Sequence, residues 1–202
     1  MPSTPEIKTA VQIGQLSAAE ADRAISVIVT AFTADPVARW VFPDAQQYLM
    51  QLPGLVRAYA GGAFEHGSAL GTQDGLGVAL WLPPGFQPDH GAVGGFSDPT
   101  VSEESQADMA VFFEEQARVH PQEPHWYLPM MGVDPAKQGR GAGSALLAHG
   151  LKIADQQGLP AYLEASTSDS RRLYERHGFE VTAEIQHGSS PTTWPMLRQP
   201  SV

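Results

Sequence analysis

A glycine-rich segment in the second half of the chain has the residue types and spacing needed to hold a phosphate group. Residues 138–143 read Gln-Gly-Arg-Gly-Ala-Gly between a predicted strand and an apolar helix. Unpaired amides and the dipole at the start of such a helix favour a negative group, and glycines let it approach the backbone. We therefore interpret this segment, the glycine-rich loop, as a binding site for a pyrophosphate. The residues predicted to contact it are Gln138, Gly139, Arg140, Gly141, Ala142, Gly143 and Ser144.

Three other interpretations of the loop can be compared with its amino-acid sequence. A nucleotide kinase or ATPase needs a Gly-Lys-Ser/Thr ending, whereas residues 143–145 read Gly-Ser-Ala, which disfavours both classes. A dinucleotide fingerprint needs glycine at the position of Ser144, and this weakens the Rossmann alternative. The third interpretation is that the glycines only allow a strand and a helix to pack tightly. The spacing favours a ligand.

The loop is positioned by an alternating series of strands and helices in the C-terminal half. Hydrophobic periodicity predicts strands at 124–133 and 161–166, helices at 141–157 and 169–177, and a further strand that starts at Phe179. This order places the loop at a strand-to-helix junction, where ligands with phosphates are expected to bind.

The N-terminal half is predicted to mix strands and helices less regularly. Ser17 and Glu20 have the spacing of a capping box at the start of a helix. Residues 1–10 are expected to lead loosely into a first strand. Residues 85–101 are expected to form an irregular surface segment, whose function the sequence does not indicate. The elements predicted here are strands at 11–16, 68–72 and 77–82 and helices at 18–34, 45–60 and 103–119, the last with a core-facing stripe of Met109, Phe112, Phe113 and Ala117.

Composition limits the classes of protein and partner. With 202 residues, of which 42% are hydrophobic, residues 1–202 are expected to form a single α/β or α+β domain. The net charge of −10 opposes binding to nucleic acid and to anionic membranes. The absence of cysteine excludes disulfides, thiolate metal sites and an acyl-cysteine intermediate. A signal-like leader and a run of about 18 apolar residues are both lacking, which predicts a cytoplasmic protein.

Two segments together resemble the GNAT superfamily of acyl-CoA-dependent N-acetyltransferases. The glycine-rich loop is similar to the family's Q/R-x-x-G-x-G/A pyrophosphate loop, and residues 173–179, Leu-Tyr-Glu-Arg-His-Gly-Phe, resemble its LYE-x-x-GF element. The resemblance covers residues 124–185 and includes the strand predicted at 161–166. It implies a mixed, mostly antiparallel sheet of about six to seven strands flanked by helices, whose fourth and fifth strands splay apart.

The resemblance also implies that acetyl-CoA is the co-substrate and that its pantetheine enters the gap between the splayed strands. Met131, Gly132 and Val133 would then offer main-chain groups that pair with pantetheine and polarise the thioester carbonyl, whatever their side chains. Ser170 would meet the pantetheine amide. It stands where many relatives carry asparagine, four residues before the tyrosine of the LYE element.

Tyr174 is the residue that the resemblance makes the catalytic acid. The reaction expels a thiolate whose thiol has a pKa of about 8.5, and a phenol with a pKa of about 10 stays protonated at neutral pH and can donate to it. The other interpretation is that Tyr174 packs on its helix face beside Leu173 and Phe179.

The attacking amine must lose a proton, which requires a base on the opposite side of the thioester. Glu164 in the strand at 161–166 is the predicted catalytic residue. His125 and Tyr127 at the start of the preceding strand are alternatives, because alternate residues share a face. His120 and Glu123 lie in the connection before that strand. The histidines show no metal-ligand spacing, so no metal is expected.

Together these residues predict an N-acetyltransferase that moves the acetyl group of acetyl-CoA to a primary amine by direct attack in a ternary complex. The alternative is a non-catalytic acyl-CoA-binding sensor or interaction module with the same fold. The acceptor is expected to be a small-molecule or peptide amine, and the sequence does not identify it further. Trp81, Trp126 and Tyr127 either line an aromatic acceptor site or pack in the core. Neither nucleic acid nor a membrane is expected as a partner, and a homodimer is compatible with the sequence.

Overall fold

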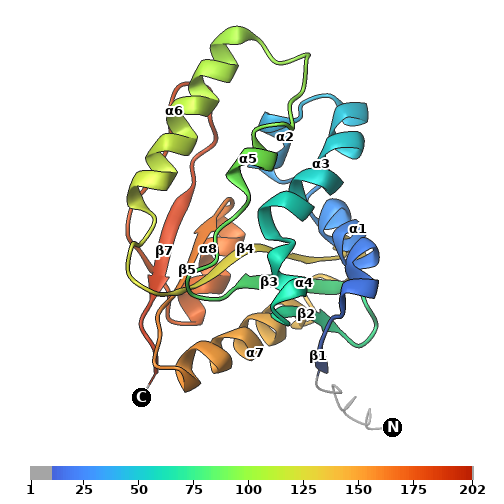
Figure 1. The fold of residues 1–202 in the computed structure, drawn as a ribbon, viewed down its shortest axis with the longest axis vertical. Helices are drawn as coiled ribbons and strands as arrows, with labels where there is room; N and C mark the ends of the chain where they lie inside the picture. Colours follow the sequence, from blue (N-terminus) through green and yellow to red (C-terminus); the bar gives the residue numbers. More distant parts are fainter. Residues whose placement is uncertain (1–10, 202) are drawn as a thin grey trace, which may run out of the picture.

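The structure, a computed structural model, describes residues 11–201 and contains a mixed sheet with helices on both faces (Figure 1). Over these residues seven strands lie in the order β1-β2-β3-β4-β5-β7-β6, and every neighbouring pair is antiparallel except β4 and β5. The expected fold class is confirmed, while the expectation for residues 1–10 lies outside the described residues. The strands are β1 (Ile13–Gln15), β2 (Ala69–Thr72), β3 (Gly77–Leu82), β4 (Trp126–Val133), β5 (Ala161–Ala165), β6 (Glu180–Val181) and β7 (Trp194–Arg198).

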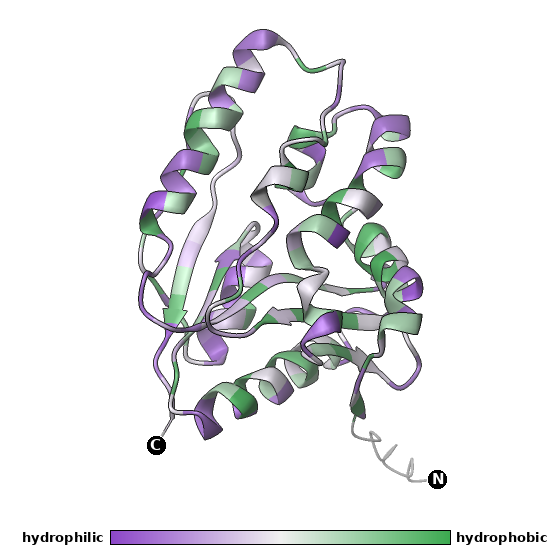
Figure 2. Cartoon of the chain, in the orientation of Figure 1, coloured by the Kyte–Doolittle hydropathy of each residue, from purple (hydrophilic) through white to green (hydrophobic). Residues whose placement is uncertain are grey.

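Helices cover the two faces of the sheet because its strands carry hydrophobic residues on both. The helices are α1 (Ala21–Ala31), α2 (Pro36–Val41), α3 (Ala45–Ala60), α4 (Gly62–Glu65), α5 (His90–Val93), α6 (Glu103–Val119), α7 (Ala142–Gln156) and α8 (Ser168–Arg176). In β3, Val78 and Leu80 pack with α1 and α3, whereas Ala79 and Trp81 pack with α7. Figures 1 and 2 show α3 and α7 on opposite sides of strands that are largely hydrophobic. No helix within residues 11–201 is long and apolar enough to cross a membrane.

β4 and β5 separate soon after they begin. Their parallel ladder ends at Tyr127 and Tyr162, although β4 continues to Val133 and β5 to Ala165. Each strand instead follows its antiparallel neighbour, which is β3 for β4 and β7 for β5. The β3–β4 ladder also has an irregularity between Leu80 and Leu82, and a bulge in a ladder bends the strand and increases its twist. The splayed fourth and fifth strands that the resemblance implies are therefore present.

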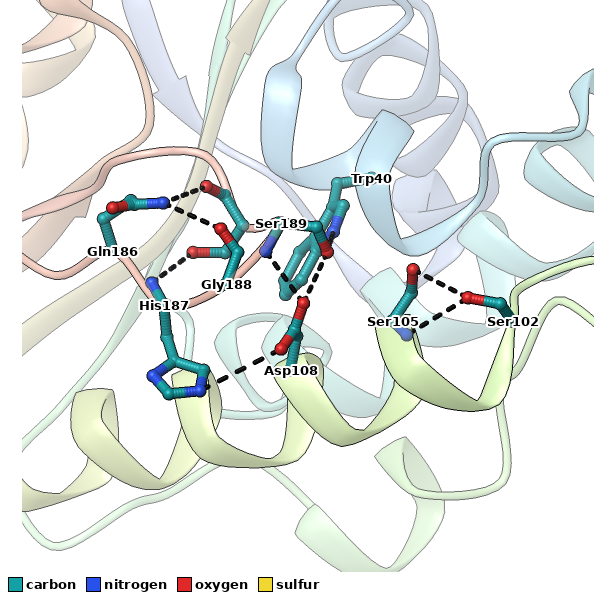
Figure 3. Close-up of polar contacts among 9 residues, drawn as sticks. Trp40, Ser102, Ser105, Asp108, Gln186, His187, Gly188 and Ser189 are labelled. Atoms are coloured by element: carbon teal, nitrogen blue, oxygen red, sulfur yellow. Dashed lines mark hydrogen bonds and ion pairs between the residues drawn. The ribbon is translucent and has the colours of Figure 1, made fainter.

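α6 lies at one end of the molecule, beside β7, and is joined to α2 and to the segment before β7 by polar contacts (Figures 1 and 3). Asp108 of α6 accepts hydrogen bonds from the backbone amide and the hydroxyl of Ser189, both at 2.8 Å. The indole of Trp40 in α2 donates to the same hydroxyl at 3.2 Å. These three residues, which we call the Asp108 junction, link segments that lie far apart in the chain.

The predicted bounds of 45–60 and 103–119 agree with α3 and α6, but the apolar stripe expected on α6 is only partly correct. Phe112 is buried and contacts the ring of Trp40 edge-on. Phe113 is 45% exposed and Ala117 is also exposed, so these two residues do not pack in the core. The cause is the position of α6 at the end of the molecule, where the sheet does not cover this side of the helix.

The prediction missed α2, α4, α5 and β7. The prediction places no element between the helices at 18–34 and 45–60. In the structure, Asp35 caps a new helix there by accepting a hydrogen bond from the amide of Ala38 at 2.9 Å, and Pro36 takes the first helical position. β7 contains Pro195, and a proline inside an apolar run argues against a strand when only the sequence is considered. Residues 85–101, expected to be irregular, include the short helix α5.

Candidate active site

The glycine-rich loop joins the end of β4 to the start of α7 in a conformation that requires glycine. Gly139 and Gly141 have φ angles of 73° and 90°, which side-chain-bearing residues rarely adopt. A Cβ atom added at either position would meet no atom of the described chain within 4 Å. α7 begins directly after Gly141 with no side-chain cap from residues 11–201, so its first amides remain available to a ligand.

Other predicted residues of the loop hold it in place. The side-chain amide of Gln138 donates to the carbonyl of Val133 at 3.1 Å and ties the loop to the end of β4. Gly143 lies against Leu173 of α8, which a Cβ atom would reach at an ordinary contact distance of 3.5 Å. Ala142 is the first residue of α7, and the side chain of Arg140 is exposed next to it.

Ser144 links the start of α7 to the end of α8. Its hydroxyl lies 2.7 Å from Nε2 of His177. Burial, together with the positive charges of Arg176 and Arg198, lowers the pKa of His177, so the imidazole is neutral at neutral pH. The residue that follows the glycine-rich loop is therefore in direct contact with the segment 173–179, which the sequence did not indicate.

The edge of β4 that faces β5 is unpaired beyond Tyr127 within the described chain. Met131, Gly132 and Val133 pair with β3 on their other edge. A Cβ atom at Gly132 would lie 2.6 Å from the Cβ of Ala31 in α1, so glycine lets α1 pack directly against this strand. Glycine at position 132 is therefore required for packing with α1, in addition to any main-chain role toward a ligand.

Tyr174 is buried in α8, where its ring lies 6.0 Å from that of Phe179 and shares a hydrophobic cluster with Leu163 and Ala165 of β5. Burial raises the pKa of Tyr174, and the negative charge of Asp35 raises it further. The phenol therefore keeps its proton at neutral pH, as a proton donor requires. Packing and proton donation are compatible at this position.

Ser170 lies one turn before Tyr174 and uses its hydroxyl in the cap of α8. The hydroxyl accepts from the amide of Thr167 at 3.2 Å and donates to the carbonyl of the same residue at 2.9 Å. Thr167 in turn accepts from the amide of Ser170 at 3.1 Å. The predicted contact between Ser170 and pantetheine would have to compete with this cap.

Asp35 is a charged residue near Tyr174 that sequence reasoning missed. One carboxylate oxygen caps α2, and the other accepts a hydrogen bond from the hydroxyl of Ser166, directly after β5. The carboxylate thus joins the turn between α1 and α2 to the end of β5. The Asp-Pro pair, which is a typical cap and first position of a helix, was the only local signal.

Glu164 lies on the opposite face of β5 from Tyr174 and accepts a hydrogen bond from an aromatic residue. The hydroxyl of Tyr127 donates to its Oε2 at 2.9 Å, and the hydroxyl of Tyr59 in α3 lies 2.6 Å from that of Tyr127. Nδ1 of His120 lies 3.7 Å from the other oxygen, Oε1. Burial, with the charge of Glu164, raises the pKa of Tyr127 well above its ordinary value, so this phenol remains a donor.

The structure thus brings three base candidates into one network, which the sequence had presented as alternatives. Glu164, Tyr127 and His125 are all in it, and His120 joins them, since its Nε2 lies 3.1 Å from Nε2 of His125. Tyr59 was missed because its spacing in the sequence is that of an ordinary apolar helix position. Within the described residues, no group of three His, Cys, Asp or Glu side chains could hold a metal ion.

Trp81 and Trp126 do not share a site with Tyr127. Both belong to the hydrophobic cluster that contains α7, on the other face of the sheet. The indole of Trp126 donates to Gln157 at 2.9 Å, and Trp81 packs on the backbone of Gly150, where a Cβ atom would lie 2.2 Å from its ring nitrogen. Core packing is confirmed for these two tryptophans.

Comparisons with known proteins agree with this geometry. The acetyltransferase (GNAT) family model matches residues 103–179, which include α6, β4, the glycine-rich loop, α7, β5 and α8. An uncharacterized N-acetyltransferase of Schizosaccharomyces pombe is 25% identical over 193 residues, which cover 85% of this chain and 75% of that protein. The mycothiol acetyltransferase of Thermomonospora curvata is 37% identical over 78 residues, but these cover 37% of this chain and 26% of that protein.

The fold has a close counterpart among solved structures. A protein of Corynebacterium glutamicum, described as histone acetyltransferase HPA2 and related acetyltransferase, superposes with a TM-score of 0.69 at 25% identity. The superposition covers 96% of this chain and 98% of the other. The likeness therefore includes the N-terminal half, which the family model does not match.

Proposed function

We propose that this chain, an acyltransferase that belongs to the acetyltransferase (GNAT) family, moves the acetyl group of acetyl-CoA directly to a primary amine of a small molecule or peptide. The observation that carries the proposal is the gap between β4 and β5. The gap opens after Tyr127, and the unpaired edge of β4 along it leads to the open glycine-rich loop.

The residues present fit two parts of acetyl-CoA, which are its pyrophosphate and its pantetheine arm. The pyrophosphate would lie on the amides of Gly139, Gly141 and the first turn of α7, with Arg140 beside it. Pantetheine would pair with the unpaired edge of β4 at residues 131–133 in the manner of an added strand. An amide of this edge would donate to the thioester carbonyl as charge develops on its oxygen.

Glu164 would accept one proton in the reaction and Tyr174 would donate another, from opposite faces of the sheet. The ammonium group of the acceptor gives a proton to the Glu164 carboxylate, and the amine nitrogen then forms a bond to the acetyl carbon. As the bond from that carbon to sulfur breaks, Tyr174 donates its phenolic proton to the thiolate. One proton is lost by the amine and one is gained by the thiol, so the exchange balances.

The experiment that tests the proposal is an amine screen with detection of free CoA thiol. Polyamines, aminoglycosides, amino acids and peptide N-termini would be mixed with the protein and acetyl-CoA. We expect thiol release that depends on an amine and that falls in Glu164→Gln, while acetyl-CoA binding measured by calorimetry is retained. Binding of acetyl-CoA without amine-dependent thiol release would instead support a non-catalytic sensor.

A further inference from the structure

The network around Glu164 includes a residue from the N-terminal half of the chain, Tyr59, which has no part in the reaction proposed above. Tyr59 lies in the last turn of α3, in a part of the chain that the family model does not match. Its ring packs against the cluster of Leu82, Tyr127 and Tyr162 and meets that of Tyr127 edge-on, with centroids 6.3 Å apart. α3 therefore presents a phenol to the side of the sheet that carries Glu164.

Glu164 stands where the backbone of β5 is no longer tied to that of β4. The parallel ladder between the two strands ends at the pair Tyr127 and Tyr162, before Glu164 is reached. Past this point, the hydrogen bond of 2.9 Å from the Tyr127 hydroxyl to Oε2 of Glu164 crosses the opening between the strands. A side-chain contact thus connects β4 to β5 where the ladder has stopped.

The Tyr127 hydroxyl has two hydrogen-bond partners, which come from different elements. It has one proton, which it gives to Glu164, so the contact of 2.6 Å with the Tyr59 hydroxyl uses the proton of Tyr59. Burial is the main reason why the pKa of both phenols is raised, so both keep their protons at neutral pH. The Tyr127 oxygen is therefore held by α3 on one side and by β5 on the other.

We propose that Tyr59 is a positioning residue, which holds the Tyr127 hydroxyl on Glu164 and so keeps the Glu164 side chain in place to accept the proton of the amine. The inference rests on the proposed role of Glu164. A base must lie within hydrogen-bond reach of the proton that it removes, and a small displacement of such a group lowers the rate. Without the Tyr59 hydroxyl, the Tyr127 hydroxyl can turn away from Glu164, and the base then loses its fixed position.

The first test compares turnover in Tyr59→Phe, Tyr127→Phe and the double variant, with an amine that the screen identifies. Loss of one net hydrogen bond should lower kcat by about 3- to 10-fold in Tyr59→Phe, with the Kd for acetyl-CoA unchanged. In Tyr127→Phe the chain of hydroxyls is already broken, so adding Tyr59→Phe should cause no further loss. An unchanged kcat in Tyr59→Phe, or an equal loss with and without the Tyr127 hydroxyl, would overturn the inference.

Tyr48→Phe is the matched control for this test. Tyr48 lies in the same helix as Tyr59, and its buried hydroxyl donates to the carbonyl of Val29 at 2.7 Å, apart from the Glu164 network. The control removes the same group from the same helix and should leave kcat intact. A loss of kcat in Tyr48→Phe equal to that in Tyr59→Phe would mean that Tyr59 acts only by stabilising α3.

The second test does not depend on activity. The free energies of unfolding in denaturant should show that the losses in Tyr59→Phe and Tyr127→Phe are not additive, whereas those in Tyr48→Phe and Tyr127→Phe should add. Additive losses for the first pair would contradict the inference, because the two hydroxyls would then not interact. Full turnover in Glu164→Gln would instead remove the proposed role of Glu164, and with it this inference, even if the two hydroxyls were coupled.

Discussion

Single residues near the gap differ in how far they could be predicted. Tyr174 belongs to a short local motif, so its type and spacing were sufficient to propose it. Asp35 raises the pKa of the same phenol from 139 positions away in the chain, and its effect depends on packing that no local pattern describes. A candidate catalytic side chain can therefore be proposed from a motif, whereas the charges that shift its pKa are found in the structure.

Removing the phenol of Tyr174 should affect turnover and not binding. We expect Tyr174→Phe to lower kcat by roughly 100-fold, the lower end of what a general acid contributes, with the Kd for acetyl-CoA nearly unchanged. The matched control is Tyr48→Phe, which removes a buried hydroxyl that donates to the carbonyl of Val29 at 2.7 Å. That change should cost ~1 kcal/mol of stability and leave kcat intact. Steady-state kinetics and calorimetry measure both, and unchanged turnover in Tyr174→Phe would contradict the assignment.

Neutralising Asp35 should change the alkaline limb of the pH profile. The carboxylate raises the pKa of Tyr174, so Asp35→Asn should lower that pKa. The phenol donates only while protonated, and kcat should therefore begin to fall at lower pH than in the unmodified protein. The measurement is kcat across alkaline pH at saturating substrates. The absence of any shift would mean that Asp35 acts on structure alone, through its cap of α2 and its contact with Ser166.

At the scale of elements, the glycine-rich loop was predicted correctly as a strand-to-helix junction, because glycines with positive φ and a capless helix start are local properties. The divergence of β4 from β5, in contrast, is not a local property. It results from each strand pairing with another neighbour, and the partner of β5 is β7, which was not predicted at all. The pairing partner of a strand is a non-local choice.

A side chain in the loop should weaken acetyl-CoA binding beyond its cost in backbone strain. Gly141→Ala forces a residue with a Cβ into a φ of 90°, at a cost of about 1–2 kcal/mol in stability, and places a methyl group where the pyrophosphate would lie. We expect the Kd to rise about tenfold or more, from lost amide contacts to an anion. Gly158→Ala at the far end of α7 is the control, since Gly158 has a φ of 65° and open space around it.

The control variant separates the two effects. Thermal unfolding should show a similar loss of stability for both variants, while calorimetry should show weaker acetyl-CoA binding for Gly141→Ala alone. Equal affinities in the two variants would mean that the loop does not hold the pyrophosphate.

At the scale of the whole molecule, the Asp108 junction attaches α6 to α2 and to the segment before β7 (Figure 3). The connection from α6 to β4 carries His120, so the attachment of α6 bears on the network around Glu164. The prediction gave α6 its correct bounds but expected its stripe to face the core. Its true environment depends on segments that are distant in sequence.

Acidification should loosen this junction. Hydrogen bonds from Ser189 lower the pKa of Asp108, with a smaller contribution from the charge of His187. A carboxylate whose pKa is lower in the folded state contributes stability above its unfolded pKa and loses it as pH falls through the folded value. The protection of α6 amides, measured as their exchange rate relative to the intrinsic rate at the same pH, should therefore decrease at acidic pH, and Asp108→Asn should remove that dependence. Exchange in α7 serves as the internal reference.

The sequence by itself determined the order of most elements, the glycine-rich loop, the motif around Tyr174 and the family they indicate. These depend on backbone preferences and spacings within a few residues, which act the same way wherever the chain folds. The tertiary structure decided which side chains surround the gap. Asp35 meets Ser166, and Tyr59 reaches Glu164 through Tyr127, across distances in sequence that carry no local signal. Such contacts form because helices and strands bury their apolar faces together, and that packing is a property of the whole chain.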